Sequence, residues 1–376
     1  MGAVCHRGDE AMTERNEAQE ERNQKIIRAV IEKAQAVCPG SLALVGITGS
    51  FATGQFHPRS DLDLLIVIND DAGYRLAVAF VEEDMQAAHD IYCFTWDRLR
   101  ETARYKNPHI AKLLDSKIVY SAGKEYDDAL RAIRDEAEAK LRAPFGEEDL
   151  AAAERFLQEA EHQFTLAQTA DAPSDVRCRS AETVNCLEDA LTMLNKQYYR
   201  LGVRARYGEL ASLQYKPDDI CALIEAVVGA ESVADIRKAS AELMKAVLAV
   251  FRNVRENLAG EKKTPGPGDL EGTYEEMYSN FRGKMHLAAE TNDRHLALMS
   301  LLNFGYMLTE EIGGAYEIGD FDVMAVYDPR DVKKTEAGFD ELLFRYKAFC
   351  ERAGVRIRQY ADTDAFIREY LEKPEG

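Results

Sequence analysis

Two apolar runs joined by a short polar connection constrain the fold of this chain more than any other feature. Residues 42–48 (LALVGIT) and 62–68 (LDLLIVI) have the length and β-branched content of buried strands. Asp61 and Asp63 open the second run, and residues two apart in a strand point to the same face. Two carboxylates this close are unfavourable unless a cation lies between them or one of them is protonated. The stretch therefore predicts a strand-turn-strand unit that binds a metal ion.

Gly49 and Ser50 directly follow the first apolar run. Glycine lets a backbone approach a phosphate closely, and a serine hydroxyl with neighbouring N–H groups at a helix start can bind phosphate oxygens. A Gly-Ser pair by itself would be read as an ordinary strand-to-helix turn. Because the paired aspartates follow at a suitable distance, we interpret Gly49 and Ser50 as a phosphate-binding turn.

This arrangement resembles the DNA polymerase β-like nucleotidyltransferases, and among them the small-molecule, aminoglycoside-type enzymes. Their pattern is a hydrophobic residue, Gly, Gly or Ser, a gap of about ten residues, and Asp-hydrophobic-Asp-hydrophobic. Here it reads Thr48-Gly49-Ser50, residues 51–60, and Asp61-Leu62-Asp63-Leu64, with the polar Thr48 as the departure. The resemblance covers residues 25–121.

The resemblance implies a fold, an activity and further site residues. Members of the family transfer a nucleoside monophosphate from a nucleoside triphosphate to an acceptor hydroxyl, and two Mg²⁺ ions about 3.5–4 Å apart assist the transfer. Asp61 and Asp63 would hold the ions, and Gly49 and Ser50 would position the β- and γ-phosphates. Asp90, at the start of a predicted strand over residues 90–95, would be the third metal ligand and would help to deprotonate the hydroxyl. We expect ATP as the co-substrate.

The fold class predicted for the whole chain is α+β. We expect a polar tail over residues 1–19, a nucleotidyltransferase domain with a mixed sheet and flanking helices over 20–143, and a helical bundle domain over 147–312. A small α/β segment is predicted over 313–376. The Pro- and Gly-rich residues 260–269 predict a loop within the bundle domain.

Two smaller features carry interpretations of their own. Lys196 lies in a polar, cationic run near the end of a helix predicted over 175–201, where it would bind the triphosphate from the second domain or simply suit the helix dipole. Asp320 and Asp322 follow a Gly-Gly pair and look like a second copy of the motif. Because only residues 315–319 separate them from the glycines, we interpret 320–326 as an ordinary strand with acidic flanks.

Composition limits the partners of the chain. The net charge of -19 argues against a long nucleic acid and favours a small or cationic acceptor. Seven cysteines without a Cys-x-x-Cys pair predict neither a disulfide framework nor a zinc site, which suits the cytoplasm. No segment has the apolar length of a signal peptide or membrane span.

The acceptor itself stays open at this stage. A small hydroxylated molecule such as an aminoglycoside suits an acidic protein, and nucleotidyl transfer to a protein or a tRNA end is the enzymatic alternative. A regulatory protein that binds nucleotide without transferring it is the alternative outside catalysis. The oligomeric state has no signature in the sequence.

Overall fold

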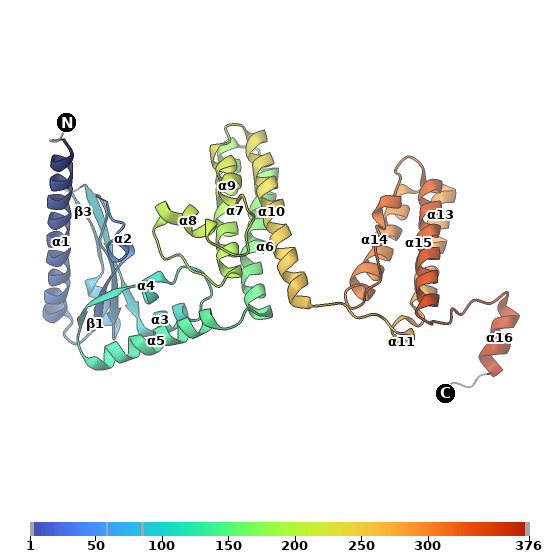
Figure 1. Cartoon of the computed structure of the whole chain (residues 1–376), viewed down its shortest axis with the longest axis horizontal. Helices are drawn as coiled ribbons and strands as arrows, with labels where there is room; N and C mark the ends of the chain where they lie inside the picture. Colours follow the sequence, from blue (N-terminus) through green and yellow to red (C-terminus); the bar gives the residue numbers. More distant parts are fainter. Residues whose placement is uncertain (1–3, 58, 84–85, 373–376) are drawn as a thin grey trace. The chain divides into compact units, whose positions relative to one another are not determined.

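The computed structural model describes residues 4–57, 59–83 and 86–372 (Figure 1). The fold is α+β, with a mixed sheet and its helices first and a mostly helical region after them. The chain divides into two compact units, residues 1–258 (unit 1) and 259–376 (unit 2). We describe each unit by itself.

Unit 1 begins with the sheet and its flanking helices. Its elements up to residue 142 are α1 (Val4–Val37), β1 (Leu42–Thr48), α2 (Gly49–Thr53), β2 (Asp63–Ile68), the 3₁₀ turn η1 (Asp71–Leu76), β3 (Val78–Glu82), β4 (Ala87–Ile91), β5 (Cys93–Thr95), α3 (Trp96–Ala103), α4 (Ala111–Leu114), β6 (Lys117–Ser121) and α5 (Lys124–Arg142).

Four of these strands form one sheet in the order β5-β2-β1-β6. β1 pairs antiparallel with β2 and β6, and β2 pairs parallel with the short β5. In the β1–β2 ladder Thr48 lies opposite Asp63, so the residue that follows β1 lies beside the second aspartate. The predicted pair of strands around the Gly-Ser turn is therefore confirmed.

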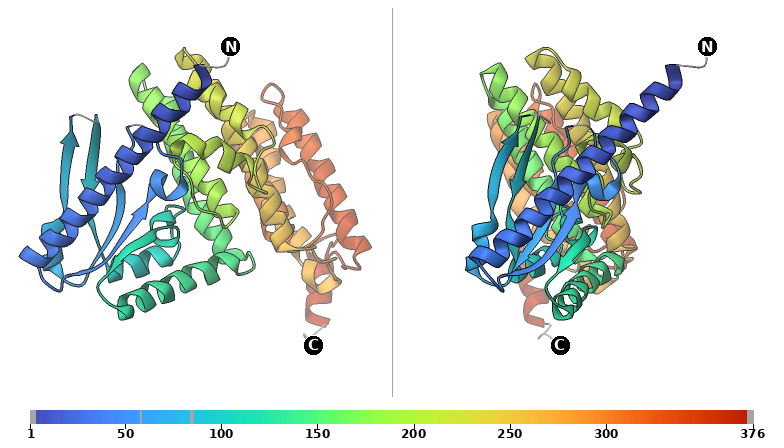
Figure 2. Two further views of the ribbon diagram at one scale, coloured as in Figure 1. Left: turned by 60° about the vertical axis from the view of Figure 1, so that its left-hand side comes forward. Right: turned by 90° about the vertical axis from the view of Figure 1, so that its left-hand side faces the viewer.

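Helices cover both faces of this sheet (Figure 2). On one face, Ile27 and Val30 of α1 pack against Leu64 and Ile66 of β2. On the other face, helices α3 and α5 pack against Leu65 and its neighbours. Because side chains alternate along a strand, Asp63 points to the same side as Leu65.

The segment between β2 and β5 differs from the prediction. Residues 74–87 have helical spacing in the sequence, but here η1 is followed by a hairpin in which β3 pairs antiparallel with β4. The predicted strand 90–95 is likewise divided into β4 and β5. The β-branched and aromatic residues Val78, Phe80 and Val81 suit a strand, and tertiary pairing with β4 outweighs the local helical pattern.

The N-terminal residues also differ from the prediction. Where we expected a polar tail over 1–19, the chain is helical from Val4 to Val37. Gln19, Arg22 and Asn23 are buried although they are polar. Their hydrogen bonds to the segment ahead of Asp61, described below, explain why this part of the helix is ordered against the sheet.

The second half of unit 1 is a helical bundle. Its elements are α6 (Glu147–Thr169), α7 (Pro173–Leu194), the 3₁₀ turn η2 (Val203–Ala205), α8 (Arg206–Ala211), α9 (Ile220–Gly229) and α10 (Val233–Ala259). Tyr105 and Ile110, which come from the first half, belong to its hydrophobic core. The Tyr105 hydroxyl donates to the Gln197 carbonyl, and the Tyr199 amide donates to the Pro108 carbonyl at 3.1 Å. These contacts join the two halves into one unit.

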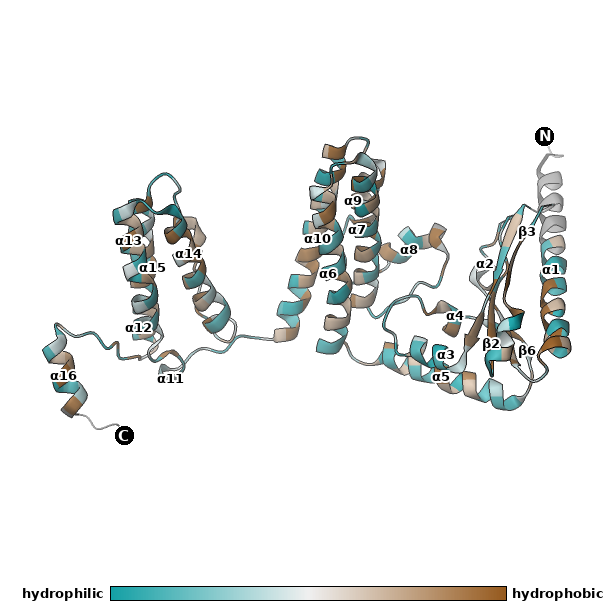
Figure 3. Ribbon diagram, turned by 180° about the vertical axis from the view of Figure 1, so that it is seen from behind, coloured by the Kyte–Doolittle hydropathy of each residue, from teal (hydrophilic) through white to brown (hydrophobic). Residues whose placement is uncertain are grey.

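Unit 2 is helical. Its elements are α11 (Pro267–Leu270), α12 (Thr273–Met277), the π-helical segment η3 (Tyr278–Arg282), α13 (Gly283–Thr291), α14 (Arg294–Tyr306), the π-helical segment η4 (Met307–Ile312), the 3₁₀ turn η5 (Met324–Val326), α15 (Val332–Arg352) and α16 (Thr363–Glu372). One core runs from Leu270 to Val355, with Phe304, Phe339 and Tyr346 fully buried in it. Hydrophobic and hydrophilic residues alternate along these helices, as expected for helices with one buried face (Figure 3).

This core corrects two expectations for the C-terminal part. Helices α12–α14 pack with α15, so the division falls at residues 258 and 259 and not after residue 312. From residue 313 to residue 372 the described chain contains helices, turns and a single isolated bridge from Lys263 to Tyr316, but no strand. The predicted strand 320–326 is wrong because an apolar run without a neighbouring strand has no ladder to join.

Within the described residues, none of the helices is both long enough and apolar enough to cross a membrane.

Candidate functional site

The chain turns sharply at Gly49, between β1 and α2. Its φ of +64° is in the left-handed region that favours glycine. A Cβ placed there would lie 2.2 Å from Oδ2 of Asp63, which is far inside van der Waals contact. The predicted turn and the second predicted aspartate are therefore in direct contact, and only glycine leaves the Asp63 carboxylate accessible from this side.

The two aspartates differ in their surroundings. Asp61 is exposed just ahead of β2, whereas the side chain of Asp63 is 38% exposed at the first position of the strand. Burial raises the pKa of Asp63, the Asp61 charge raises it further, and Lys112 opposes both. Since the Asp61 charge acts on Asp63, the two carboxylates lie near each other, and their joint binding of a metal stays a prediction.

Lys112 of α4 places a positive charge beside Asp63. Its Nζ lies 3.6 Å from Oδ1 of Asp63, donates to the Tyr92 hydroxyl at 2.5 Å, and lies 4.2 Å from the centre of the Tyr92 ring. The contact with Asp63 shows that this carboxylate lies where a positive charge is favourable.

A cavity of about 360 Å³ opens at this turn, between the sheet and the bundle. Thr48, Gly49 and Asp63 line it on one side, and Arg200 and Arg206 line it on the other. His109, Lys112 and Asp115 complete the polar part of its wall. Three permanent cations against two carboxylates give the cavity a local excess of positive charge, opposite in sign to the charge of the whole chain.

The arginines of this wall are held in different ways. Arg206 pairs with Glu188 of α7 at 3.2 Å, and its guanidinium carbon lies 3.4 Å from the centre of the Tyr199 ring. Burial raises the pKa of Glu188 to about 7, although Arg206 lowers it. The side chain of Arg200 is 64% exposed and lies 3.6 Å from Asp115. Arg206 is thus fixed, whereas Arg200 has room to meet a ligand.

His109 brings an acid-base group to the same cavity. Its Nε2 lies 3.4 Å from Oδ2 of the buried Asp189, and its ring is 5.2 Å from the Tyr199 ring. Asp189 also accepts a hydrogen bond from the Tyr199 hydroxyl at 2.9 Å. With Nε2 directed at Asp189, Nδ1 is left as the nitrogen that can accept a proton.

Asp90 is not brought to the cavity. It is exposed on β4 and lies opposite Ala79 of β3, while it is β5 that pairs beside the Asp61-Asp63 strand. No group of three His, Cys, Asp or Glu side chains close enough to hold a metal occurs in residues 18–57, 59–83, 86–203 or 205–371, where side chains are described. The predicted set of three carboxylates is therefore not assembled, because the strand that was to carry Asp90 belongs to the hairpin.

Lys196, predicted to bind phosphate, does not line this cavity and has its contacts elsewhere. α7 ends at Leu194, so Lys196 lies beyond the helix with φ +50°. Its ammonium group donates to the Ala143 carbonyl at 2.9 Å and pairs with Asp149 at 3.1 Å. Lys196 therefore joins α6 to the end of α5 and is already neutralised there.

Ser50 adjoins the cavity without being part of its lining. It is half-buried in the first turn of α2, and its carbonyl accepts hydrogen bonds from the Gln55 amide and the Thr53 hydroxyl. Its predicted contact with phosphate stays a prediction.

The residues of the site fit a magnesium ion. Mg²⁺ prefers oxygen ligands, and proteins commonly hold it with one or two carboxylates while substrate phosphates and water complete its shell. Asp61 and Asp63 supply two carboxylates, and the missing Cβ of Gly49 leaves Oδ2 of Asp63 accessible. A third protein ligand is not required for this mode of binding.

Comparison with known proteins agrees with this geometry. Residues 24–129 match the family model described as "Nucleotidyltransferase domain". The resemblance of this part of the chain to nucleotidyltransferases, predicted from the sequence, is therefore confirmed. No curated protein matches the chain.

A solved structure of a nucleotidyltransferase-like protein from Exiguobacterium sibiricum 255-15 also matches. The match has 10% sequence identity and a TM-score of 0.34, and it covers 59% of this chain and 72% of the other.

Several residues of this nucleotidyltransferase site have no signal in the sequence. Lys112 and His109 follow Asn107-Pro108, which indicates only a helix start, and Arg206 lies in a polar stretch after Gly202. They meet at the cavity because the segment 105–115 packs into the bundle core. A single cationic residue in a short helix has no periodicity that would single it out.

Proposed function

We propose that this protein is a Mg²⁺-dependent nucleotidyltransferase that moves a nucleoside monophosphate from a nucleoside triphosphate, with ATP as the expected donor, to a hydroxyl of a small acceptor. The observation that carries the proposal is the contact between Gly49 and the Asp63 carboxylate at the wall of a cationic cavity. The match of residues 24–129 to the nucleotidyltransferase family supports it. We place the activity in the cytoplasm, where free thiols persist.

Each group of the cavity has a role in this reaction. Asp61 and Asp63 would hold two Mg²⁺ ions, which would supply positive charge to offset the negative charge of the phosphates. The Gly49 backbone makes room for the β- and γ-phosphates, and Arg200 and Lys112 stabilise the negative charge that develops on them.

We assign to His109 the role of the general base that takes the proton of the acceptor hydroxyl. Nδ1 takes this proton while Nε2 stays directed at Asp189, and the hydroxyl oxygen forms a bond to the α-phosphorus. The bond between that phosphorus and the oxygen of pyrophosphate breaks, and pyrophosphate leaves with the electron pair. We favour His109 over the predicted Asp90 because His109 lines the cavity and Asp90 does not.

The local charge sharpens the choice of acceptor. The positive charge of the cavity suits the triphosphate and does not favour a cationic acceptor. Support for a cationic acceptor such as an aminoglycoside comes instead from the negative net charge of the whole protein. Lys112, Arg200 and Arg206 would repel a polycation unless a nucleotide is already bound. We therefore infer that the nucleotide binds before a cationic acceptor.

Incubation with [α-³²P]ATP and Mg²⁺ tests the proposal. The acceptors to compare are an aminoglycoside, bulk tRNA and the protein alone, and pyrophosphate release is followed in parallel. We expect label on the small acceptor and none with Asp63→Asn. Label on tRNA or on the protein would show that the acceptor is a macromolecule and not a small molecule. Absence of both nucleotide binding and pyrophosphate release would refute the enzymatic function.

A further inference from the structure

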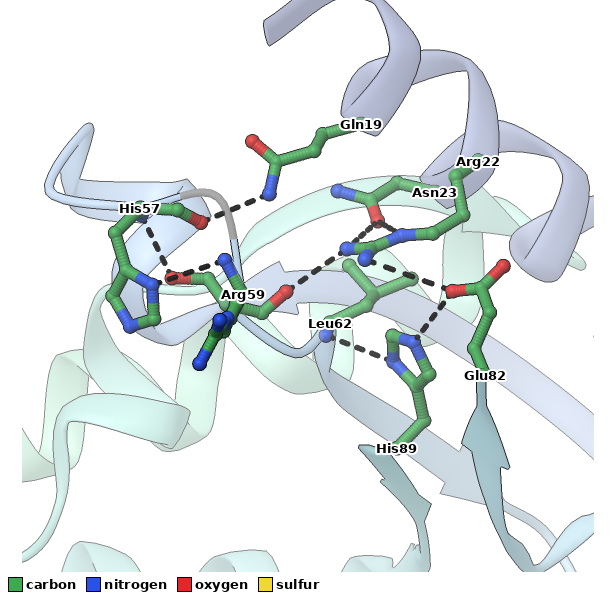
Figure 4. A network of polar contacts seen from close by, with 9 residues as sticks. Gln19, Arg22, Asn23, His57, Arg59, Leu62, Glu82 and His89 are labelled. Atoms are coloured by element: carbon green, nitrogen blue, oxygen red, sulfur yellow. Dashed lines mark hydrogen bonds and ion pairs between the residues drawn. The ribbon is translucent and has the colours of Figure 1, made fainter. Parts of the chain in front are cut away.

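A buried polar network joins α1 to the segment that carries the two aspartates (Figure 4). Gln19 donates from Nε2 to the His57 carbonyl at 2.9 Å, and Arg22 donates from Nη2 to the Ser60 carbonyl at 3.0 Å. The Ser60 hydroxyl in turn accepts from the His57 amide at 2.9 Å. Helix α1 therefore holds the residues just ahead of Asp61 by their backbone.

His89 of β4 extends this network to the residue between the aspartates. Its Nδ1 accepts a hydrogen bond from the Leu62 amide at 3.1 Å. The side chain of His89 is fully buried, and the Phe80 ring stacks on it with 4.9 Å between ring centres. Alternation along β4 places His89 on the side opposite to Asp90, so it touches the backbone of the site and not the cavity.

Glu82 fixes the direction of the His89 ring. Its Oε2 lies 3.4 Å from Nε2 of His89 and 3.7 Å from Nη1 of Arg22. Since Nδ1 accepts from Leu62, the ring proton must be on Nε2, where it points to the Glu82 carboxylate. One carboxylate thus orients both the histidine and the arginine that hold the segment 60–62.

Strand pairing by itself does not fix the positions of both aspartates. β2 begins at Asp63, and its ladder with β1 ends at the pair of Thr48 and Asp63. Asp61 and Leu62 lie beyond the ladder, so no β-sheet hydrogen bond sets the distance between the two carboxylates. The hydrogen bond from Leu62 to His89 continues the order of the strand past its end.

We propose that His89 is a positioning residue for the Asp61-Asp63 pair and that Glu82 and Arg22 orient it. The inference rests on the proposed function, because positioning matters only if the two carboxylates bind a metal-nucleotide complex. Groups that orient metal ligands from behind commonly change metal affinity by about 10- to 100-fold when they are removed.

Two substitutions of His89 separate positioning from packing. His89→Leu introduces an apolar side chain of similar size that cannot accept a hydrogen bond from the Leu62 amide. His89→Asn offers a carbonyl oxygen close to the position of Nδ1, which can accept it. Phe80→Leu is the matched control, because it removes the stacked ring and leaves the hydrogen bond. The full-length protein is used throughout.

Two readouts apply to each variant. Binding of Mn²⁺ with α,β-methylene-ATP is followed by electron paramagnetic resonance, and hydrogen exchange is measured on peptides that cover 57–63 and, for comparison, β1 and β6. We expect His89→Leu to weaken Mn²⁺-nucleotide binding about 10-fold or more. Exchange should accelerate in 57–63 with little change in β1 and β6, and His89→Asn and Phe80→Leu should stay within about 3-fold of wild type.

The outcomes are distinguishable. If wild-type protein does not bind the Mn²⁺-nucleotide complex, the proposed function fails, and the exchange rates still decide whether His89 holds the segment. If His89→Leu binds as wild type does, the positioning role is refuted. Should His89→Leu fail to fold, Glu82→Gln applies the same test, since it keeps the shape and removes the charge that orients both His89 and Arg22. Unchanged binding and exchange in Glu82→Gln would then refute the inference.

Discussion

The two units differ in what they bury. Unit 1 buries the charged or titratable side chains of Arg22, His89 and Asp189, whereas the buried polar residues found in the described part of unit 2 are Ser300 and Thr335. A buried charge is unfavourable unless partners compensate it, so such groups gather where geometry matters more than stability. The comparison indicates that unit 1 is built around a site and unit 2 around its core.

The two Asp-x-Asp motifs show the same contrast at the scale of a few residues. Asp63 contacts Gly49, and burial raises its pKa. Asp320 and Asp322 are exposed, and the Asp322 carboxylate accepts from the Ala325 amide at 3.2 Å to cap a short turn. The same Asp-x-Asp pattern therefore forms part of a site in one place and caps a turn in the other, because only the first motif follows a glycine turn that packs against it.

The largest effect is expected in the core of unit 2. Phe339 is fully buried between Phe304 and its neighbours, so Phe339→Ala should lower the free energy of unfolding of unit 2 by about 3–5 kcal/mol. Nucleotide binding by unit 1 should be unchanged. Chemical denaturation measures the free energy of unfolding, and titration with ATP measures nucleotide binding. A loss of nucleotide binding in this variant would show that the two units are not independent.

Substitution of Asp61 or Asp63 should abolish nucleotidyl transfer. Asp61→Asn and Asp63→Asn each remove a charge that no other group replaces, and we expect transfer to fall by at least about 10²- to 10³-fold. The matched control is Asp320→Asn with Asp322→Asn, which should transfer at the wild-type rate. Activity that survives in Asp63→Asn would contradict the site.

Glu188 should make unit 1 sensitive to pH. Burial raises its pKa in the folded protein to about 7, from an ordinary value of 4.5. Between these values the folded state keeps a proton that the unfolded state has lost, so stability from this group falls as the pH rises from about 4.5 to about 7 and is constant above.

Glu188→Gln removes this dependence. Across the same window the variant should gain about 1–3 kcal/mol relative to wild type. Denaturation at pH 5, 6, 7 and 8 measures the gain, and a difference that does not vary with pH would show that Glu188 titrates normally.

Gly49 and Gly54 offer a matched pair for the turn. Both have positive φ, +64° and +74°, but only at Gly49 would a Cβ meet another group. Gly54→Ala should therefore cost about 1 kcal/mol of backbone strain, and Gly49→Ala about 2–3 kcal/mol together with loss of nucleotide binding. Equal effects on binding would mean that close contact with Asp63 is not what the glycine provides.

The smallest effect is a gain in stability from Asp63→Asn. Because burial and Asp61 raise the pKa of Asp63, its charged form destabilises the folded protein at neutral pH. The variant should be more stable by less than about 1 kcal/mol at pH 7, since the side chain is partly exposed and Lys112 offsets some of the cost. The gain should vanish as the pH falls and Asp63 becomes protonated. A loss of stability at pH 7 would show that the ion pair with Lys112 dominates.

Local patterns were sufficient for the parts of the molecule that depend on neighbouring residues. The strands around the Gly-Ser turn and the helical character of the residues after 147 follow from side-chain periodicity and turn chemistry. The hairpin β3–β4 did not, because β-strands form only with a partner, and that partner outweighed a local helical pattern.

What the sequence by itself determined is the pair of carboxylates and the glycine turn before them, since their geometry depends on strand alternation and one backbone angle. Only the tertiary structure decided which cations face them. Lys196 was bound elsewhere by Asp149, while Lys112 and His109 reached the cavity through the packing of residues 105–115 on the bundle, which itself carries Arg206. The physical reason is that distances between remote segments are set by the packing of the core and not by local residue order.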